Sequence, residues 1–567
     1  MKMMKFKYIS ILAGFLFMAV ACETTELDLA DNPNELGENQ SDANLLLNSI
    51  QIDFGRFVEL MGLHGGQVTR IDYMDGRNYQ NAYTPAAFNG EWSAAYQSTG
   101  AVFAQEGFNY TVNGILADVR AMTPLAEEQG FLHHIAIGQA IEAYTIVTLV
   151  DFFGDVPYSE ALQKSDNLNP KVDPGAEIYD AALQLLDQAI ANFGQDVSTE
   201  PVDFYYEGDW EKWIKFSNTL KMKIYLQRRL VDPTAIDSFN AIVATGNFIT
   251  ETEEDLQFQW GANVLQPDSR HPRYGNTYKP GGADEYMSNW LMNYMLTTED
   301  PRMLYYFFRQ TNAVPGEEIL PDEETIECSL ESAPAHYVAG NHIFCSLPTG
   351  YWGRDHGDDD GIPPDGFLRT IYGVYPAGGR FDDSSFEGGR SGQGGQGAGI
   401  TPILLASWVD FMRAEIALEE GNIAGAKMLM ESGITKSVSK VRSFINLDTS
   451  ADREFVPSET TVTDHLMRIS EAYDSAADDA ERLDVIAQQY WVSMFGNGID
   501  AYNFYRRTGA PRTLQPNIES SPGRFIRSFF YPADFVTNNA SVTQKSDTNV
   551  KVFWDTNPDS PAFPVAN

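Results

Sequence analysis

Cysteine is scarce in this chain of 567 residues, which holds only Cys22, Cys328 and Cys345. Their spacing lacks the Cys-x-x-Cys pairs and the histidine partners of a structural zinc site, so the sequence gives no support to one. Cys328 and Cys345 fit a disulfide formed in an oxidising compartment, which would stabilise the fold by about 3 kcal/mol. They fit two free buried thiols equally well, and the sequence leaves both alternatives open.

Positive charge is also scarce. The 39 Lys and Arg residues face 79 Asp and Glu residues, which gives a formal net charge of −40 at pH 7. A field of this sign repels phosphate backbones, so we exclude nucleic acid as a partner. A neutral or cationic ligand fits the charge better. The hydrophobic content of 43% and the aromatic content of 12% are typical of a globular chain.

Recognisable catalytic motifs are missing as well. The sequence holds no Ser/His/Asp motif, nucleophile elbow or His-Glu-x-x-His. The glycine pattern Gly392-x-Gly394-x-x-Gly397 follows a polar segment rather than a strand, so we interpret it as a flexible linker. We therefore predict that the protein is not an enzyme. The alternative of a glycosidase stays open, because such an enzyme needs only two carboxylates at a suitable separation and this acidic chain offers many.

The N-terminus has the layout of an exported lipoprotein. Three lysines precede the apolar run Ile9–Val20, which is too short to span a membrane and is typical of a signal peptide. The run leads into Ala19-Val20-Ala21-Cys22, which resembles a bacterial lipobox. The alternative is an ordinary secretory signal cleaved near Ala21. We predict a signal peptide over 1–21, acylation of Cys22 and a polar tether over 22–41.

Helical periodicity dominates much of the remaining chain. Apolar residues recur at helical spacing in the segment 131–162, at Ile137, Ala140, Ile141, Tyr144 and Val147. This pattern predicts a buried helix. Gly154 and Pro157 predict its end, because proline lacks the amide hydrogen that would continue the helix. Similar patterns predict helices over 176–191 and 209–229.

A helical pair is predicted over 400–434, with its turn at Gly421-Asn422. Small alanines where the two helices cross are typical of a tetratricopeptide unit. We therefore predict a mainly α fold, a tetratricopeptide-like helical-repeat superhelix with a large irregular loop-rich ligand face. Glu415 lies on the first helix of this pair, and we expect it at the helix surface or in a capping role.

The composition divides the mature chain into three parts. Residues 42–262 are predicted to form an N-terminal helical-repeat part that contains a ligand-loop segment over 64–92. Residues 263–399 lose the helical period and are rich in Gly, Pro, Asp and Tyr, which predicts a loop-rich insertion. Residues 400–567 are predicted to form a C-terminal helical-repeat part with an irregular tail.

Two loop segments carry the candidate ligand-binding residues. They are Tyr73, Arg77, Asn78 and Tyr79 in the first segment, and Tyr351 and Trp352 in the insertion. Aromatic rings stack on the apolar faces of sugars, while Arg and Asn side chains bond hydroxyl groups. The alternative interpretation is that these rings pin long loops onto the helices.

An acidic run in the insertion suggests calcium. Asp355, Asp358 and Asp360 are the candidate ligands, because hard oxygen ligands at this density suit Ca²⁺. The EF-hand template fails at its first position, His356, and at its twelfth, Phe367. A calcium site outside the EF-hand class is one hypothesis, and a solvated acidic turn is the other.

Several segments, in order along the chain, resemble the SusD/RagB family of outer-membrane lipoproteins. The segment 151–162 reads DFFGDVPYSEAL and resembles the signature turn of the family. The segment 211–229 resembles its second conserved helix, and 486–516 resembles its C-terminal landmark, in which an Asn-Gly turn leads to an aromatic run and Arg-Arg-Thr-Gly.

The resemblance implies a function. Such a protein is tethered to the outer membrane, faces the cell exterior and lids a SusC-like TonB-dependent barrel. It would bind a nutrient, usually an oligosaccharide and sometimes a peptide, and deliver it for uptake without breaking a bond. No cofactor would be required, and calcium is the only structural ion that the sequence suggests. The alternatives are a surface glycan-degrading enzyme and a repeat scaffold that binds protein partners.

Overall fold

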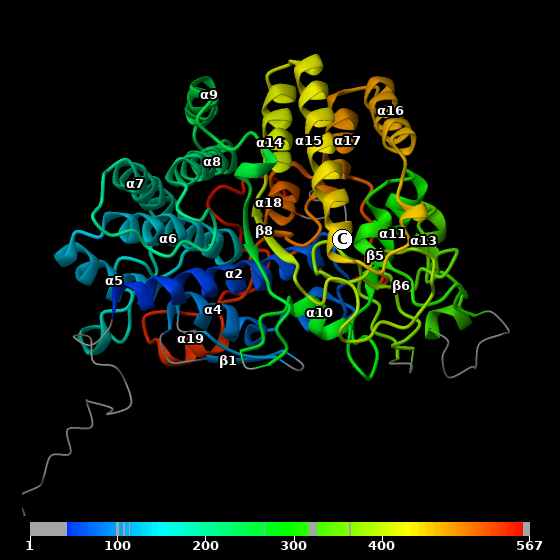
Figure 1. Cartoon of the computed structure of the whole chain (residues 1–567), viewed down its shortest axis with the longest axis horizontal. Coiled ribbons are helices and arrows are strands. Elements are labelled where there is room, and N and C mark those ends of the chain that lie inside the picture. The colour runs from blue at the N-terminus through cyan, green and yellow to red at the C-terminus, as the bar shows by residue number, and fades with distance from the viewer. Residues whose placement is uncertain are drawn as a thin grey trace, which may run out of the picture.

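The computed structural model describes residues 42–97, 101–105, 108–112, 114–265, 267–316, 326–361 and 365–559. About 52% of the chain is helical, which confirms the predicted mainly α fold. The predicted signal peptide, the lipidation site Cys22 and the tether lie outside the described residues. Figure 1 shows helices α5–α9 grouped at one end of the molecule, helices α14–α17 in the middle and the loop-rich segment at the other end.

The N-terminal part is built from helices that pack on one another in sequence. They are α2 (Ala43–Val68), α3 (Tyr79–Ala82), α4 (Asn89–Tyr96), α5 (Ile115–Gln129), α6 (Leu132–Phe153), α7 (Gly175–Phe193), α8 (Trp210–Arg228) and α9 (Ala235–Thr245). Helix α6 packs against both α5 and α7, and α8 packs against α7 and α9. An antiparallel hairpin, β1 (Ala101–Gln105) and β2 (Phe108–Val112), is inserted between α4 and α5.

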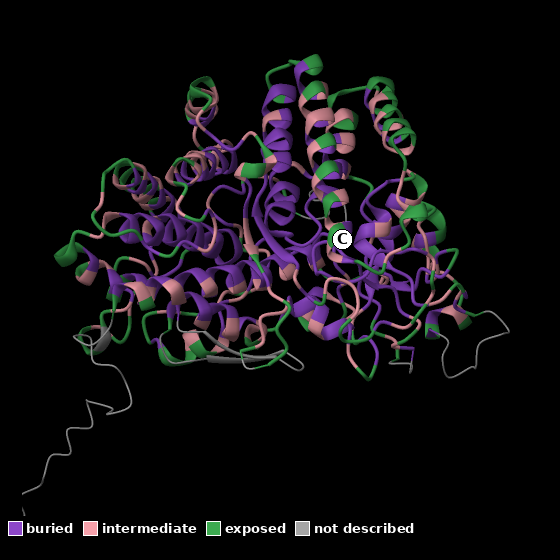
Figure 2. Ribbon diagram, viewed as in Figure 1, coloured by how far each residue is buried: buried purple, intermediate pink, exposed green. Residues whose placement is uncertain are grey.

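Helix α6 is the central helix of this part, as predicted. By length and composition it is apolar enough to cross a membrane, but 94% of its most apolar window is buried inside the fold, as expected of a core helix. Figure 2 shows it buried along nearly its whole length. It ends at Gly154, whose φ of 76° is easily adopted by glycine. The carboxylate of Asp173 then accepts hydrogen bonds from the backbone amides of Tyr158 and Ser159, at 2.8 and 2.7 Å, which fixes the turn.

The C-terminal part repeats the same construction. It contains α14 (Ala406–Glu419), α15 (Ile423–Ser443), α16 (Glu459–Ser475), α17 (Asp479–Ser493), α18 (Ile499–Thr508) and α19 (Ala533–Asn538). The predicted turn is present: Gly421 has a φ of 75°, and the Asn422 side chain caps α15 by accepting a hydrogen bond from the Gly425 amide at 3.0 Å. Helices α14, α15, α16 and α17 pack on one another, and α18 lies against α2.

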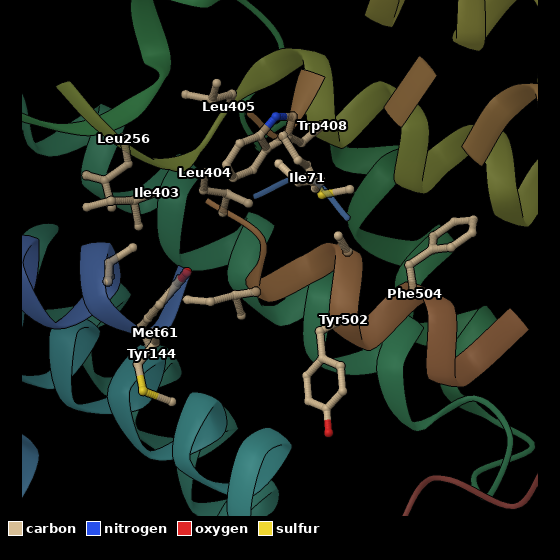
Figure 3. Close-up of a cluster of buried hydrophobic side chains, with 14 of the residues drawn as sticks. Met61, Ile71, Tyr144, Leu256, Ile403, Leu404, Leu405, Trp408, Tyr502 and Phe504 are labelled. Atoms are coloured by element: carbon tan, nitrogen blue, oxygen red, sulfur yellow. The ribbon is translucent and has the colours of Figure 1, made fainter. Parts of the chain in front are cut away.

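A two-stranded sheet and a shared core join the two helical parts. Strand β3 (Leu256–Gln259) pairs antiparallel with β8 (Ile400–Leu404). Figure 3 shows side chains from α2, α6, β3, β8, α14 and α18 converging around this sheet, among them Tyr144 and Trp408. Both are buried, as is the surrounding cluster, which runs from Ala43 to Trp554. The two parts therefore share one hydrophobic core.

A buried ion-pair network reinforces this joint. The Glu415 carboxylate on α14 pairs with Arg507 of α18, at 2.6 Å, and with Arg229 just after α8, at 2.9 Å. Glu415 is only 2% exposed, so the expectation of a surface or capping role was wrong. Burial alone would raise the pKa of Glu415, but the two arginines outweigh it and lower that pKa.

The loop-rich segment is ordered by short elements. They are α10 (Pro272–Thr277), β4 (Met287–Ser288), α11 (Asn289–Thr297), α12 (Met303–Tyr306), β5 (Phe307–Phe308), α13 (Ala335–Gly340), β6 (Gly353–Arg354) and β7 (Ile371–Tyr372). Strand β4 runs parallel to β6, and β5 runs antiparallel to β7. Cys328 and Cys345 form a disulfide, so the alternative of two free thiols was wrong.

The glycine pattern at 392–397 is not a flexible linker. The backbone amides of Gly395 and Gly397 donate to the carbonyls of Gly379 and Gly378, at 3.1 and 3.0 Å. The Tyr274 hydroxyl donates to the carbonyl of Gln393 at 2.9 Å. A Cβ atom on Gly394 would lie 2.0 Å from the Gly379 carbonyl oxygen, so glycine allows this close backbone approach.

Candidate ligand-binding site

The two loops that the sequence predicts as ligand-binding lie side by side, although about 280 positions separate them. The Gly357 amide donates to the carbonyl of Met74 at 2.8 Å, and the Arg77 amide donates to the carbonyl of Gly357 at 3.0 Å. The Tyr73 hydroxyl donates to the carbonyl of Asp358. Residues 73–78 and 355–361 are therefore joined to each other, and their exposed positions, such as Arg77, Asp359 and Asp360, lie on neighbouring parts of the surface.

Arg77 lies at the centre of the polar part of this surface. Its Nε atom lies 2.7 Å from Asp359, its Nη1 atom lies 3.0 Å from Glu519, and it also pairs with Asp360. We call these four residues the Arg77 cluster. The Arg77 side chain is 43% exposed, so a ligand could reach its guanidinium and the three carboxylates. The hydrogen bond to Asp359 is the main cause of the raised pKa of Arg77.

Tyr73 and Asn78 flank the Arg77 cluster, and both are half-buried. The Tyr73 ring meets the ring of Tyr286 edge-on, with centroids 6.0 Å apart. The Asn78 side chain caps the short helix α3 by accepting a hydrogen bond from the Asn81 amide at 3.0 Å. The fold thus brings Tyr73, Arg77 and Asn78 together, and their ligand-binding role stays a prediction.

The rings of Tyr79, Tyr351 and Trp352 are buried, which corrects the expectation that they face a ligand. The Tyr79 hydroxyl accepts a hydrogen bond from Arg70 at 3.3 Å. The Tyr351 ring lies 4.9 Å from the Arg309 guanidinium. The Trp352 indole donates to the carbonyl of Ala313 at 3.0 Å. These rings pin the loops in place, which is the alternative that the sequence left open.

The aspartates predicted to bind calcium make other contacts. The buried Asp355 carboxylate accepts hydrogen bonds from the Cys345 amide at 2.6 Å, from Asn289 at 3.1 Å and from Gln515 at 2.7 Å. Asp360 pairs with Arg77. Across the part of the chain that the structure describes, no group of three His, Cys, Asp or Glu side chains is arranged to hold a metal ion. The calcium hypothesis therefore gains no support from the geometry.

Asp358 is buried beneath the Arg77 cluster's loop. Its Oδ1 atom accepts a hydrogen bond from the Asp360 amide at 3.1 Å, while its buried Oδ2 atom has no partner among the described residues. Burial, only partly offset by the Arg354 guanidinium, raises the pKa of Asp358 to about 6. Burial likewise raises the pKa of Asp355 to about 6. The pKa values of both carboxyl groups in this loop are therefore raised above the usual range of aspartate.

A cation–π stack supports the loop from behind. The guanidinium groups of Arg354 and Arg369 lie 4.4 and 3.9 Å from the centroid of the Tyr286 ring. The Tyr286 hydroxyl donates to Asp365 at 2.7 Å, and Asp365 also pairs with Arg369 at 2.6 Å. This stack holds the loop in a fixed shape, because the two guanidinium groups contact the Tyr286 ring and the Asp365 carboxylate binds both Tyr286 and Arg369.

Sequence reasoning missed two members of the Arg77 cluster. Asp359 belongs to the acidic run, which the sequence indicates as a calcium site or a solvated turn and not as a partner of Arg77. Glu519 lies between α18 and α19, more than 400 positions from Arg77, and no local pattern links the two. Only the folded chain brings these residues together.

Comparison with known families gives two matches. Residues 57–319 match a family described as starch-binding and associating with the outer membrane, and residues 397–554 match the SusD and RagB outer-membrane lipoprotein family. No curated protein matches the chain significantly.

Solved structures with the same fold cover nearly the whole chain. A SusD homologue from Bacteroides uniformis is 17% identical with a TM-score of 0.62, over 91% of this chain and 100% of that one. A SusD-like protein from Bacteroides thetaiotaomicron is 20% identical with a TM-score of 0.60, over 88% and 93% of the two chains. A chitin-binding SusD homologue from Flavobacterium johnsoniae is 18% identical with a TM-score of 0.55, over 91% and 98%.

The two matches follow one another along the chain and cover most of both helical parts and the first part of the loop-rich segment between them. The predicted family landmarks at 151–162, 211–229 and 486–516 all lie within the matched ranges. On this evidence the chain belongs to the SusD/RagB family.

Proposed function

We propose that this protein binds a nutrient glycan at the cell surface and passes it to a transporter without chemical change. The observation that carries the proposal is the pair of family matches, whose descriptions name starch binding and an outer-membrane lipoprotein. The chitin-binding function of the Flavobacterium johnsoniae homologue also supports a glycan ligand.

The Arg77 cluster is our candidate for the glycan contact. It offers guanidinium donors and carboxylate acceptors, and both bond sugar hydroxyls. The half-buried ring of Tyr73 and the amide of Asn78 lie at its edge. Because the loop beneath is fixed by the Tyr286 stack, little conformational entropy would be lost on binding.

In the proposed role, acyl chains on Cys22 anchor the protein to the outer membrane, where it forms the lid of a SusC-like TonB-dependent barrel. Several acyl chains, at about 0.8 kcal/mol per buried CH₂ group, are enough for firm anchoring. A Cys22→Ser variant tests the anchor: we expect it to leave the outer-membrane fraction and appear as soluble protein. A variant that still sediments with the outer membrane contradicts the anchor.

The binding proposal is tested by incubating the purified mature chain with a panel of glycans. We expect depletion of some glycans with no new reducing ends. Arg77→Ala should reduce retention, while Arg512→Gln, an exposed arginine on another surface, serves as the matched control. New reducing ends would instead indicate a glycan-degrading enzyme. Co-purification of proteins without glycan retention would indicate a repeat scaffold.

A further inference from the structure

A groove apart from the Arg77 cluster lies where the C-terminal helices meet the loop-rich segment. Its volume is about 490 Å³. It is lined by Tyr305, Ser439, Arg442, Ser443, Arg453 and Glu459, together with two aliphatic side chains. Helices α15 and α16 pack on each other above it, and Tyr305 comes from α12 in the loop-rich segment. None of these residues belongs to the Arg77 cluster.

The groove is rich in hydrogen-bond donors. Arg442 pairs with the exposed carboxylate of Glu459 at 2.7 Å and donates to the carbonyl of Pro457 at 3.1 Å. The exposed Arg453 donates to the carbonyl of Ile445 at 3.2 Å, and it forms no ion pair with any residue that the structure describes. Among the residues that line the groove, two arginines stand against one carboxylate, Glu459.

The hydroxyl group of Tyr305 is a second observation that points to a ligand in this groove. The residue is fully buried, and its ring meets Phe381 edge-on at 4.9 Å. Tyr305 lines the groove, and its hydroxyl has no hydrogen-bond acceptor among the described atoms. Burial raises the pKa of Tyr305, although a side-chain hydrogen bond with Arg442, followed by the charges of Arg442 and Arg453, acts in the opposite direction. Because arginine can only donate, the Tyr305 hydroxyl still lacks an acceptor for its own proton, and a ligand oxygen would supply one.

We propose that this groove binds the carboxylate of an acidic sugar, such as a uronic acid unit of a glycan. Arg442, Arg453 and Tyr305 line the same groove and can all donate to one carboxylate, and Ser439 and Ser443 suit the hydroxyls of the same sugar. The inference rests on the proposed glycan-binding function and narrows its ligand class.

The net charge of the chain does not prevent this recognition. At physiological salt, charges more than about 8 Å apart in solvent are largely screened, so the local arginines decide the contact. The Glu459 side chain is 83% exposed. An incoming carboxylate would therefore replace a weakly held surface partner at Arg442 rather than break a buried ion pair.

The test measures binding of tri-galacturonate and of neutral maltotriose to the mature chain by calorimetry. We expect Arg453→Gln to weaken tri-galacturonate binding roughly tenfold or more, as for one charge-assisted contact, and Tyr305→Phe to weaken it roughly several-fold while preserving the ring packing. Arg453→Lys should restore part of the affinity. Arg512→Gln, which removes a charge elsewhere, should leave it unchanged.

The outcomes separate this inference from the proposed function. If maltotriose or another neutral glycan binds and tri-galacturonate does not, the groove proposal is overturned and glycan binding stands. If tri-galacturonate binds equally well to the wild type and both groove variants, the groove is likewise overturned. If tri-glutamate competes through the same residues with higher affinity, the ligand is an acidic peptide and the sugar assignment is wrong. If no glycan binds anywhere, the proposed function itself fails.

Discussion

The helical scaffold and the loop-rich segment 263–399 are stabilised in different ways. In the scaffold, α6 buries apolar side chains on nearly every face, and its neighbours pack with periodic stripes. The loop-rich segment also contributes apolar side chains to the core, but its buried residues include two charge pairs with both partners inside the segment. Arg302 and Asp300 pair at 2.6 Å with no exposed side-chain surface, and Arg309 pairs with Asp382 at 2.7 Å.

The difference shows what holds an irregular segment in place. Without a helical period, a loop cannot bury a continuous apolar stripe, so its backbone and charged groups must find specific partners. The Tyr286 stack, the Cys328–Cys345 disulfide and the two buried ion pairs supply such partners. The cost of removing one of them should therefore be local, whereas a core residue of α6 affects the whole fold.

The largest effect is expected from Phe152→Ala in α6. Phe152 is fully buried and stacks on Phe529 with centroids 5.4 Å apart. Loss of the ring should lower the free energy of unfolding by about 3–5 kcal/mol, measured by urea denaturation. Leu168→Ala, at a side chain 71% exposed, is the control and should change stability by less than about 0.5 kcal/mol. A loss below about 1 kcal/mol for Phe152→Ala would contradict the claim that core residues of α6 stabilise the whole fold.

A smaller and local effect is expected from removing the disulfide. The bond joins positions 17 apart, so replacing both cysteines by serine should destabilise that loop by about 3 kcal/mol. Amide hydrogen exchange should accelerate over 326–361 while α6 keeps its protection. Equal acceleration in α6 would show that the two regions unfold as one unit.

An intermediate pH effect is expected from Asp358. Its pKa is raised to about 6, so the stability that protonation gives the folded chain is complete below pH 4 and is lost as the pH rises through 6. Asp358→Asn lacks this titration. The wild type should therefore gain about 1 kcal/mol relative to the variant when the pH falls from 7.5 to 5.

The same comparison carries its own control. Between pH 7.5 and 8.5 the carboxyl group is ionised throughout, so the stability difference between the wild type and Asp358→Asn should stay constant. Chemical denaturation at each pH measures it. A difference that does not change between pH 5 and 7.5 would contradict the role of burial at Asp358.

The smallest stability effect is expected at the Arg77 cluster. Its ion pairs are exposed, so Arg77→Ala should cost less than about 1 kcal/mol of unfolding free energy. Arg512→Gln, another exposed arginine, should behave similarly. A loss of several kcal/mol would mean that Arg77 is a structural residue, and reduced glycan binding by that variant would then have a trivial explanation.

Much of the scaffold could be predicted because its signals are local. The apolar period and the Gly154 and Pro157 stop define α6, and Gly421-Asn422 defines the turn between α14 and α15. The candidate site could be predicted only in part. Both loops were found from composition, but nothing local shows that Tyr73 contacts Asp358 or that Arg77 contacts Glu519.

By itself, the sequence determined that this chain builds stacked helices and belongs among the SusD/RagB proteins, because helical periods and landmark turns are properties of neighbouring residues. The tertiary structure decided which polar residues meet and which rings remain exposed. Tyr79, Tyr351 and Trp352 carry the composition of a binding surface, yet they pack inward. The physical reason is that burial and charge pairing depend on contacts between distant segments, which only the folded core brings together.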